Sequence, residues 1–527
     1  MEPALFFMRA GITAAALLLA AIPNSLVLSL PMDELAEVRP NVLLITLDTV
    51  RADRMGFLGS TRGLTPSLDA LARQAVVFTR AYAQAPITTV SHATILTGTY
   101  PPFHGVRDFG APLPANVPYL PDLFHHAGYR TGAFVGSLIL DPHAGTAPGF
   151  DRGFDVYDAG FRIRRPGEDR YATVERRGDE VVARAIRWLN VATTQANPTS
   201  PTRPAGPTRP GRPTPPTRAS APFFLWVHLF DAHDPYDPPR DLKARYAAAP
   251  YDGEIAAVDR LAGRLVQAVA PETIVVVAAD HGEALGDHGE DTHGVFLYDA
   301  TLHVPLVVRL PDRRGAGARI TSRVRLADVA PTLLEAAGVL VPPAMQGESL
   351  LPLVSVTAVQ DRPVYAETDY PRQAFGWSSL LSWRTDNFLL VRAPRRELYD
   401  DRADPRATKN LADARGPAAD RLERELEQFI RRTAGGGGPQ APNDPALAQR
   451  LASLGYVGGS GRAGGASSVD PKDRIQTANT LRTAIAAVED GAFQKAIPLL
   501  ERVTASEPTI PIAQLNLGIA QIGRAHV

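Results

Sequence analysis

The sequence contains no cysteine among its 527 residues. That absence excludes disulfide bonds, thiolate metal ligands and a cysteine nucleophile, and it leaves the redox compartment undetermined. An excess of charge of either sign is also missing, because 55 Lys and Arg stand against 56 Asp and Glu. A net charge of −1 gives no general attraction to polyanions. We therefore expect no nucleic-acid partner.

Aromatic residues are few, at 7%, but 45% of the chain is hydrophobic, which is enough for one large α/β domain and a smaller appendage. One apolar run, residues 10–30, follows a short segment that carries Arg9. Its length lies between that of a secretory signal and that of a short membrane span, so residues 1–31 are predicted to be a signal peptide or a membrane anchor. Either role predicts an extracytoplasmic protein, periplasmic or secreted. A buried core helix is the alternative, although Pro23 interrupts the run.

The middle of the chain alternates between two kinds of pattern. Apolar, β-rich runs predict strands, and amphipathic segments predict helices. The strands are expected at 129–136, 223–229, 273–279 and 304–310, and the helices at 65–75, 174–191, 253–269 and 328–337. Such alternation predicts a doubly wound, mainly parallel sheet with helices on both faces. Residues 195–221, rich in Pro, Thr and Arg, are predicted to be an extended insertion that adds nothing to the core.

The carboxyl-terminal part, residues 470–527, follows two glycine-rich stretches and is rich in Ala and Leu. Gly491, Ala496 and Pro508, with Gly518 beginning a second unit, fit the small-residue spacing of a tetratricopeptide repeat of about 34 residues. One and a half repeats do not form a stable solenoid alone. We therefore expect a short all-α segment, the truncated start of a longer array, with a protein partner.

Two apolar strands end on ionisable side chains. Residues 41–48 read Asn-Val-Leu-Leu-Ile-Thr-Leu-Asp, and residues 273–283 end on Asp280, His281, Gly and Glu. The carboxyl ends of parallel strands are where open α/β sheets bind their ligands. Burying an adjacent Asp and His costs free energy unless a metal or another partner compensates. Asp48, Asp280 and His281 are therefore predicted to hold a divalent metal ion, although Asp48 alone could cap the element after its strand.

Residues 85–98 indicate a loop followed by a short helix that begins near Thr88. The amino terminus of a helix favours an anionic phosphate or sulfate. Thr88 is placed to act as a nucleophile, and since a threonine hydroxyl is inert at its free pKa, it would need coordination to the metal ion. The alternative is that Thr88 only caps the helix.

Histidines are concentrated in one part of the chain, because six of the twelve lie between residues 228 and 303. His228 lies inside a predicted apolar strand and His303 lies in the segment LYDATLHVPL. A satisfied core or surface histidine is the better interpretation of each, and we exclude both from the site. His288 either orients its neighbours or belongs to a loop. His233 and His293 remain candidates.

Six segments resemble the sulfatase family within the alkaline phosphatase superfamily. They are NVLLITLDTVRAD at 41–53, APITTVSHATILTG at 85–98, FFLWVHLFDAHDPYDPP at 223–239, ADHGEALGDHGEDTHGVFLYDATLHVPLVV at 279–308, DVAPTLLEAAGV at 328–339 and ELYDDRADPRATKNLAD at 397–413. Together they imply an alkaline phosphatase-like catalytic domain over residues 38–456.

The resemblance also implies roles for single residues. Asp48, Thr88, Asp280 and His281 fall on metal-ligand positions, and Thr88 is also the aligned nucleophile. His233 falls where the family contacts the anionic group or assists the leaving group.

His293 lies near the place of a family lysine, as a general acid, a phosphate contact or a second-metal ligand. His92, in the motif of Thr88, is a further catalytic candidate.

Two departures from the family pattern change the chemistry expected. Sulfatases that make formylglycine carry Cys or Ser in a Cys/Ser-x-Pro-x-Arg motif, and Thr88 cannot become that aldehyde. Thr49 stands where many sulfatases have a second metal-binding Asp. The remaining set resembles the phosphate-handling branches of the superfamily, so a phosphoester substrate is favoured over a sulfate ester.

The ion is expected to be Zn²⁺ or Mn²⁺, with Ca²⁺ or Mg²⁺ as alternatives and either one or two ions bound. Three functions stay open at this point: a hydrolase of anionic phosphate or sulfate esters, a transferase acting on a membrane or envelope polymer, and an inactive scaffold for the repeat segment.

Overall fold

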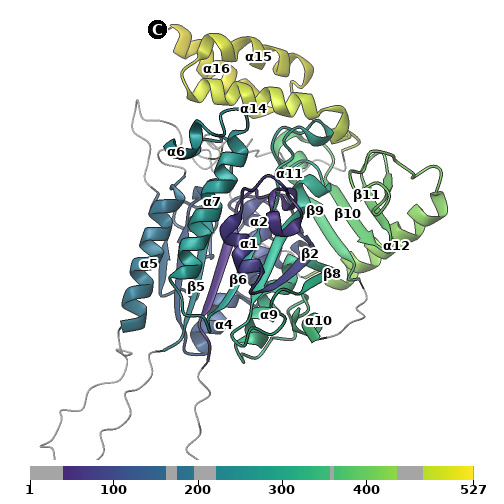
Figure 1. Cartoon of the computed structure of the whole chain (residues 1–527). Helices are drawn as coiled ribbons and strands as arrows, with labels where there is room; N and C mark the ends of the chain where they lie inside the picture. Colours follow the sequence, from purple (N-terminus) through teal and green to yellow (C-terminus); the bar gives the residue numbers. More distant parts are fainter. Residues whose placement is uncertain are drawn as a thin grey trace, which may run out of the picture. The chain divides into compact units, whose positions relative to one another are not determined.

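One eight-stranded sheet forms the centre of this part of the computed structural model (Figure 1). Its strand order is β4-β3-β5-β1-β6-β7-β2-β8. The strands are β1 Val42–Leu47, β2 Val76–Tyr82, β3 Arg130–Val135, β4 Val156–Asp158, β5 Phe223–Leu229, β6 Ile274–Ala279, β7 His303–Arg309 and β8 Arg319–Arg325. Every residue of β1, β5 and β6 is buried, which explains why these strands are continuous apolar runs without alternation.

Strand directions make the sheet mainly parallel. β1 lies between β5 and β6 and is parallel to both, whereas β7 is antiparallel to its two neighbours. The predicted strands correspond to β3, β5, β6 and β7, so the predicted fold class is confirmed. As a consequence, β1, β5 and β6 deliver the residues that follow them to the same edge of the sheet.

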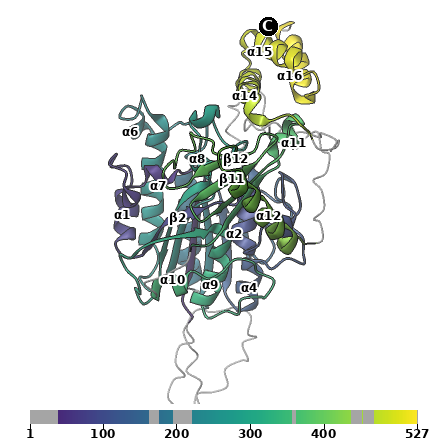
Figure 2. The same ribbon diagram turned by 90° about the vertical axis from the view of Figure 1, so that its right-hand side faces the viewer.

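Helices cover both faces of this sheet, with α1 and α7 on one side and α2, α4 and α9 on the other (Figure 2). The helices of this part are α1 Pro66–Ala72, α2 Thr88–Thr97, α3 Pro101–His104, α4 Leu120–His126, α5 Gly178–Thr194, α6 Arg240–Lys243, α7 Pro250–Gln267, α8 Asp299–Leu302, α9 Val329–Ala336, α10 Leu351–Ser355 and α11 Tyr370–Phe375. The predicted helices correspond to α1, α5, α7 and α9, and α5 begins later than predicted, at Gly178.

A second, antiparallel sheet follows, with strand order β12-β11-β10-β9. Its strands are β9 Val364–Thr368, β10 Leu380–Thr385, β11 Phe388–Arg392 and β12 Glu397–Asp400. The amphipathic helix α12, Gly416–Thr433, packs its buried residues Leu422, Leu426 and Phe429 in one cluster with Tyr365 and Trp383 of this sheet.

Three consecutive helices form the carboxyl-terminal segment, drawn in yellow in Figure 1. They are α14 Ile475–Glu489, α15 Phe493–Ser506 and α16 Pro511–Ala525, and each packs against the next in the chain. The predicted all-α segment is therefore confirmed, while its assignment as a tetratricopeptide repeat stays a prediction.

The structure describes residues 39–161, 175–194, 221–355, 361–435, 451 and 467–525. The predicted signal peptide or anchor at 1–31 and nearly all of the proline-rich insertion at 195–221 lie outside these residues. Within them, no helix combines the length and hydropathy needed to cross a membrane.

Candidate active site

Two neighbouring strands end at the centre of the site. Leu47 of β1 pairs with Ala279 of β6, so Asp48 and Asp280 leave the sheet at the same edge. The backbone N–H of His281 donates to Oδ1 of Asp280 over 2.7 Å, which fixes that carboxylate against the strand end. All three side chains are fully buried. Their ligand atoms lie within 4.8 Å of one another, which is a spacing that one metal ion can bridge.

Thr88, the first residue of α2, lies beside this group. Its Oγ lies 3.3 Å from Nε2 of His281 and 3.5 Å from Oδ2 of Asp48. Ile87, and not Thr88, is the N-cap of α2, so the capping alternative for Thr88 does not hold. One turn further, Ser91 Oγ donates to the carbonyl of Asp280 over 2.6 Å and fastens α2 to the end of β6. The nucleophile candidate and the metal-ligand candidates are thus held in one rigid unit.

The donor atoms of this group fit a cation. Oδ1 of Asp48 and Oδ2 of Asp280 are buried and accept no hydrogen bond within the described residues. Burial raises the pKa of both carboxyls, and for Asp280 the charge of Asp48 adds to the rise. His281 donates from Nδ1 to the carbonyl of Gly282 over 3.0 Å, which leaves Nε2 as the ligand nitrogen. Two buried carboxylates side by side repel each other when both are ionised, so a cation bound between them would stabilise both.

Thr49, at the position of the second family Asp, does not replace that carboxylate. Its Oγ lies 2.8 Å from the carbonyl oxygen of Asp48 and 2.7 Å from that of Ala232, so the hydroxyl donates to backbone carbonyl groups. Its φ of 54° is in the left-handed region, which costs a β-branched residue about 1–3 kcal/mol. The two contacts of the hydroxyl hold the turn at Asp48 and Thr49 in this conformation.

His228, which we excluded as a satisfied core histidine, lies in the centre of the site, and that interpretation is wrong. Its Nε2 is 3.3 Å from Oδ2 of Asp48, and neither ring nitrogen makes a hydrogen bond within the described residues. With His92 and Asp280 it forms a second buried group of three possible ligands. The sequence carried a signal, since a lone imidazole inside the otherwise apolar strand β5 is costly without a partner.

His92 occupies a supporting position behind Thr88. Its Nδ1 donates to the carbonyl of Thr88 over 2.8 Å, and its Nε2 accepts from Oγ of Thr46 at 3.0 Å. Burial lowers its pKa to about 3, so the ring is neutral. Because both ring nitrogens are occupied by the protein, this geometry suits a residue that positions Thr88 better than one that meets the substrate.

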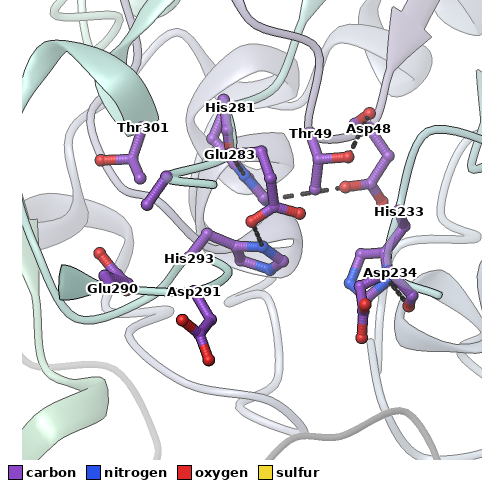
Figure 3. Close-up of polar contacts among 12 residues, drawn as sticks. Asp48, Thr49, His233, Asp234, His281, Glu283, Glu290, Asp291, His293 and Thr301 are labelled. Carbon is purple, nitrogen blue, oxygen red and sulfur yellow. Dashed lines mark hydrogen bonds and ion pairs between the residues drawn. The ribbon is translucent and has the colours of Figure 1, made fainter. Parts of the chain in front are cut away.

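His233 and His293 lie together beside His281 (Figure 3). The ring centroids of His233 and His293 are 5.1 Å apart, and those of His281 and His293 are 4.5 Å apart. His233 is 4% exposed and His293 6%, whereas Asp48, Thr88, Asp280 and His281 are fully buried. These two histidines therefore form the edge of the site nearest to solvent.

Glu283 supports this edge, and it was not among the residues selected from sequence patterns. Its Oε1 lies 3.1 Å from Nδ1 of His293, and Tyr236 donates to its Oε2 over 3.1 Å. Burial raises the pKa of Glu283 well above its usual range, and burial lowers the pKa of His293. Both shifts favour the uncharged forms of this pair, so the contact between Glu283 and His293 is one hydrogen bond between two buried groups.

Two further histidines lie outside the group. His303 places Nε2 3.0 Å from the carbonyl of Thr79 and stacks on Tyr82, as expected for a structural residue. His288 bonds to the carbonyl of Arg406 over 3.0 Å and stacks on Tyr298. Of its two interpretations, the loop histidine fits this placement.

The arrangement combines a buried hydroxyl, several buried imidazoles and two carboxylates, each with one oxygen that accepts no hydrogen bond from the described residues, at the carboxyl edge of a mainly parallel sheet. Residues 40–198 and 216–339 match the model of the sulfatase family. The chain belongs to the sulfatase family. Residues 286–434 also match the carboxyl-terminal model of N-sulphoglucosamine sulphohydrolases. The protein is accordingly a sulfatase-family hydrolase, and the family's use of a divalent metal agrees with the buried Asp and His group.

Curated relatives match this sulfatase over most of their length. The uncharacterized sulfatase YidJ of Escherichia coli is 26% identical over 430 residues, which are 71% of this chain and 83% of the relative. A Δ4,5-hexuronate-2-O-sulfatase of Bacteroides thetaiotaomicron is 26% identical over 427 residues, 72% of this chain and 85% of the relative.

Solved structures share the fold. The phosphonate monoester hydrolase of Agrobacterium radiobacter has a TM-score of 0.55 at 24% identity, covering 75% of this chain and 96% of the other. That of Silicibacter pomeroyi has a TM-score of 0.57 at 22% identity, with 75% and 96% covered.

Proposed function

We propose that this protein hydrolyses phosphoesters, phosphodiesters included, with Thr88 as the nucleophile and a divalent metal ion in the Asp48, Asp280 and His281 group. The observation that carries the proposal is the position of the Thr88 hydroxyl, 3.3 Å from His281 and 3.5 Å from Asp48, in a chain whose residue at this position cannot become formylglycine.

Asp48, Thr88, Asp280 and His281 would hold the ion, and His228 would face it as well. When bound, a divalent cation lowers the pKa of the Thr88 hydroxyl and offsets the negative charge of the ester. A donor set with one or two imidazoles favours Zn²⁺ or Mn²⁺ over Ca²⁺ or Mg²⁺, which prefer oxygen ligands alone.

Thr88 acts first in the mechanism that we propose. Its Oγ passes its proton to Oδ2 of Asp48, 3.5 Å away, and attacks phosphorus in line with the ester oxygen, so that the new P–Oγ bond forms as the bond to the leaving group breaks. Asp48 returns this proton to Oγ when the threonine is released. The products of this step are a phospho-threonine and an alkoxide. A proton that passes from the Glu283 carboxyl to Nδ1 of His293, 3.1 Å away, would let Nε2 of the same ring give its proton to the alkoxide, and burial favours the proton-bearing form of this carboxyl.

Water completes the reaction by attacking the same phosphorus and releasing Thr88. His233 is suited to accept the proton of this water. Its Nδ1–H donates to the carbonyl of Asp234 over 2.6 Å, so the proton of the neutral ring is on Nδ1 and Nε2 is the basic nitrogen, and burial lowers the pKa of the ring and favours its neutral form.

The choice of phosphate over sulfate follows from the nucleophile. A formylglycine diol can release sulfate by eliminating it from the same carbon, whereas a threonine ester has no such path and must be cleaved at the central atom. A phosphate monoester carries more negative charge than a sulfate ester, whereas a phosphate diester and a phosphonate monoester carry the same single charge, so it is the attack at the central atom that favours phosphorus here. Sulfate esters are the second candidate, which the names of the curated relatives favour.

Three aryl substrates measured side by side test this choice: an aryl sulfate, an aryl phosphate diester and an aryl phosphonate monoester. In metal-replete protein, we expect kcat/KM for one of the phosphorus substrates to exceed that for the sulfate by at least about tenfold, a difference of roughly 1.4 kcal/mol. Subtracting the rate of Thr88→Ala removes the contribution of contaminants. A clear preference for the aryl sulfate would refute the phosphoester proposal while leaving Thr88 as a nucleophile.

A second prediction concerns His228, whose two ring nitrogens make no hydrogen bond in the described part of the chain although Nε2 lies 3.3 Å from Oδ2 of Asp48. We expect His228→Asn to weaken metal binding by roughly 10- to 100-fold, because a nitrogen that faces the ion is lost. Calorimetric titration with Zn²⁺ or Mn²⁺ measures this directly. His303→Asn is the matched control, since its nitrogen bonds to Thr79 and lies outside the group. Equal metal affinity of the two variants would remove His228 from the ligand set.

A further inference from the structure

The carboxyl-terminal helices contact the solvent-facing edge of the site through one arginine. Arg482 of α14 places Nη1 2.9 Å from Oδ2 of Asp234 and Nη2 3.7 Å from Oδ2 of Asp291. Asp234 follows His233 directly in the sequence, and Asp291 precedes His293 by two residues. Figure 3 shows these four side chains. A single guanidinium therefore joins the two loops that carry the edge histidines.

A second side chain of α14 adds to this contact. Asn479, one turn before Arg482 and on the same face of the helix, donates from Nδ2 to the carbonyl of Gly289 over 2.8 Å. Its Oδ1 accepts from the backbone N–H of Asp291 over 3.4 Å. Of the two loops, Asn479 hydrogen-bonds to that of His293, whereas Arg482 forms ion pairs with both.

The loop of His293 needs such support from outside. Between Leu285 and Gly294 the backbone enters the left-handed region at five positions, and its regular structure is limited to a 3-10 turn at Asp287–Gly289. Irregular backbone of this kind is held by its neighbours and not by a repeating hydrogen-bond pattern. Arg51 holds the amino-terminal part of the loop through the carbonyl oxygens of Glu283 and Ala284, while α14 holds the part that leads to His293.

We propose that α14 is part of the active-site edge and that Arg482 is a positioning residue that fixes His233 and His293 relative to each other. This inference rests on the roles given to the two histidines under the proposed function. It also assigns a task to the carboxyl-terminal segment, because α14 lies beyond the residues matched by either family model. Arginine suits the task, since its planar fork can bind two carboxylates at once, which a lysine cannot do with the same geometry.

Hydrogen exchange of the full-length, metal-free protein tests the inference without any substrate. We expect Arg482→Gln to raise deuterium uptake in peptides that cover 230–238 and 284–296, and Asn479→Ala to raise it only in 284–296. The matched control is Arg502→Gln, an exposed arginine on α15. Global stability should change little, because Arg482, Asp234 and Asp291 are all partly exposed.

Kinetics supply the second measurement. We expect Arg482→Gln to lower kcat by roughly 10- to 100-fold with a smaller change in KM and with unchanged metal content, because the acid and base are displaced while the ion site is intact. Arg482→Lys should recover part of this loss. If Arg482→Gln matches Arg502→Gln in exchange and in kcat, the inference is refuted. A wild-type protein inactive on all three aryl esters would refute the proposed function, and the exchange data would still decide on Arg482.

Discussion

Replacing Thr88 by alanine is expected to lower kcat/KM on the best aryl substrate by roughly four orders of magnitude or more, because no other hydroxyl occupies this place. The Thr88 Oγ lies between His281 and Asp48, where it can meet both the ion and the ester. Steady-state assay of purified Thr88→Ala in metal-replete buffer measures the effect. A covalent phospho-threonine, trapped by acid quench and located by mass spectrometry, should be present in the wild type and absent in the variant.

Two variants control for effects on folding. Thr89→Ala removes a neighbouring hydroxyl of the same helix that bonds to the carbonyl of Ile139 over 3.3 Å and does not reach the Asp and His group. It should retain nearly full activity. Thr88→Ser keeps a hydroxyl at the position and should retain measurable turnover. Activity of Thr88→Ala close to that of Thr89→Ala would show that the nucleophile is another group.

Removal of divalent metal is expected to lower activity by roughly a thousandfold and to destabilise the protein. The activity falls because nothing else offsets the charge of the ester or lowers the pKa of Thr88. Stability falls because Asp48 and Asp280 then lie buried without a positive partner. Restoring Zn²⁺ or Mn²⁺ well above its Kd should raise Tm by roughly 5 °C or more. Chelation followed by titration with single metals, read by assay, by differential scanning calorimetry and by elemental analysis, also gives the number of ions.

The matched pair for this experiment is Asp280→Asn and Asp312→Asn. Asp280→Asn should abolish both the metal-dependent activity and most of the metal-dependent rise in Tm. Asp312 lies on an exposed turn, with 57% of its side chain accessible, and its variant should respond to metal like the wild type. Full activity after exhaustive chelation, with no ion found by elemental analysis, would contradict a metal-dependent mechanism.

Much of the fold could be predicted because local patterns and strand directions agree. The runs that became β5 and β6 are fully buried, so their apolar character is required over their whole length and can be read in the sequence. The expectation that Asp48 and Asp280 would meet also follows from chain direction alone, because residues after adjacent parallel strands emerge at one edge.

His228 shows the limit of prediction from local sequence patterns. A histidine in an apolar strand is equally consistent with a hydrogen-bonded core residue and with a ligand, and the difference depends on what the neighbouring strand presents. Thr46 of β1 lies opposite His228 in register, and Asp48 follows two residues later, which brings the imidazole to the carboxylate. Glu283 and Arg482 were missed for the same reason, since their partners are distant in sequence or belong to another segment.

The sequence by itself determined the parallel sheet, the position of the Asp and His group at its edge and the absence of a formylglycine precursor, because these depend on residue identity and on local order along the chain. Only the tertiary structure decided which histidines face the group, that His92 lies behind Thr88, and that α14 reaches the loops of His233 and His293. Those relations depend on strand register and on contacts between distant segments, and no local pattern encodes them.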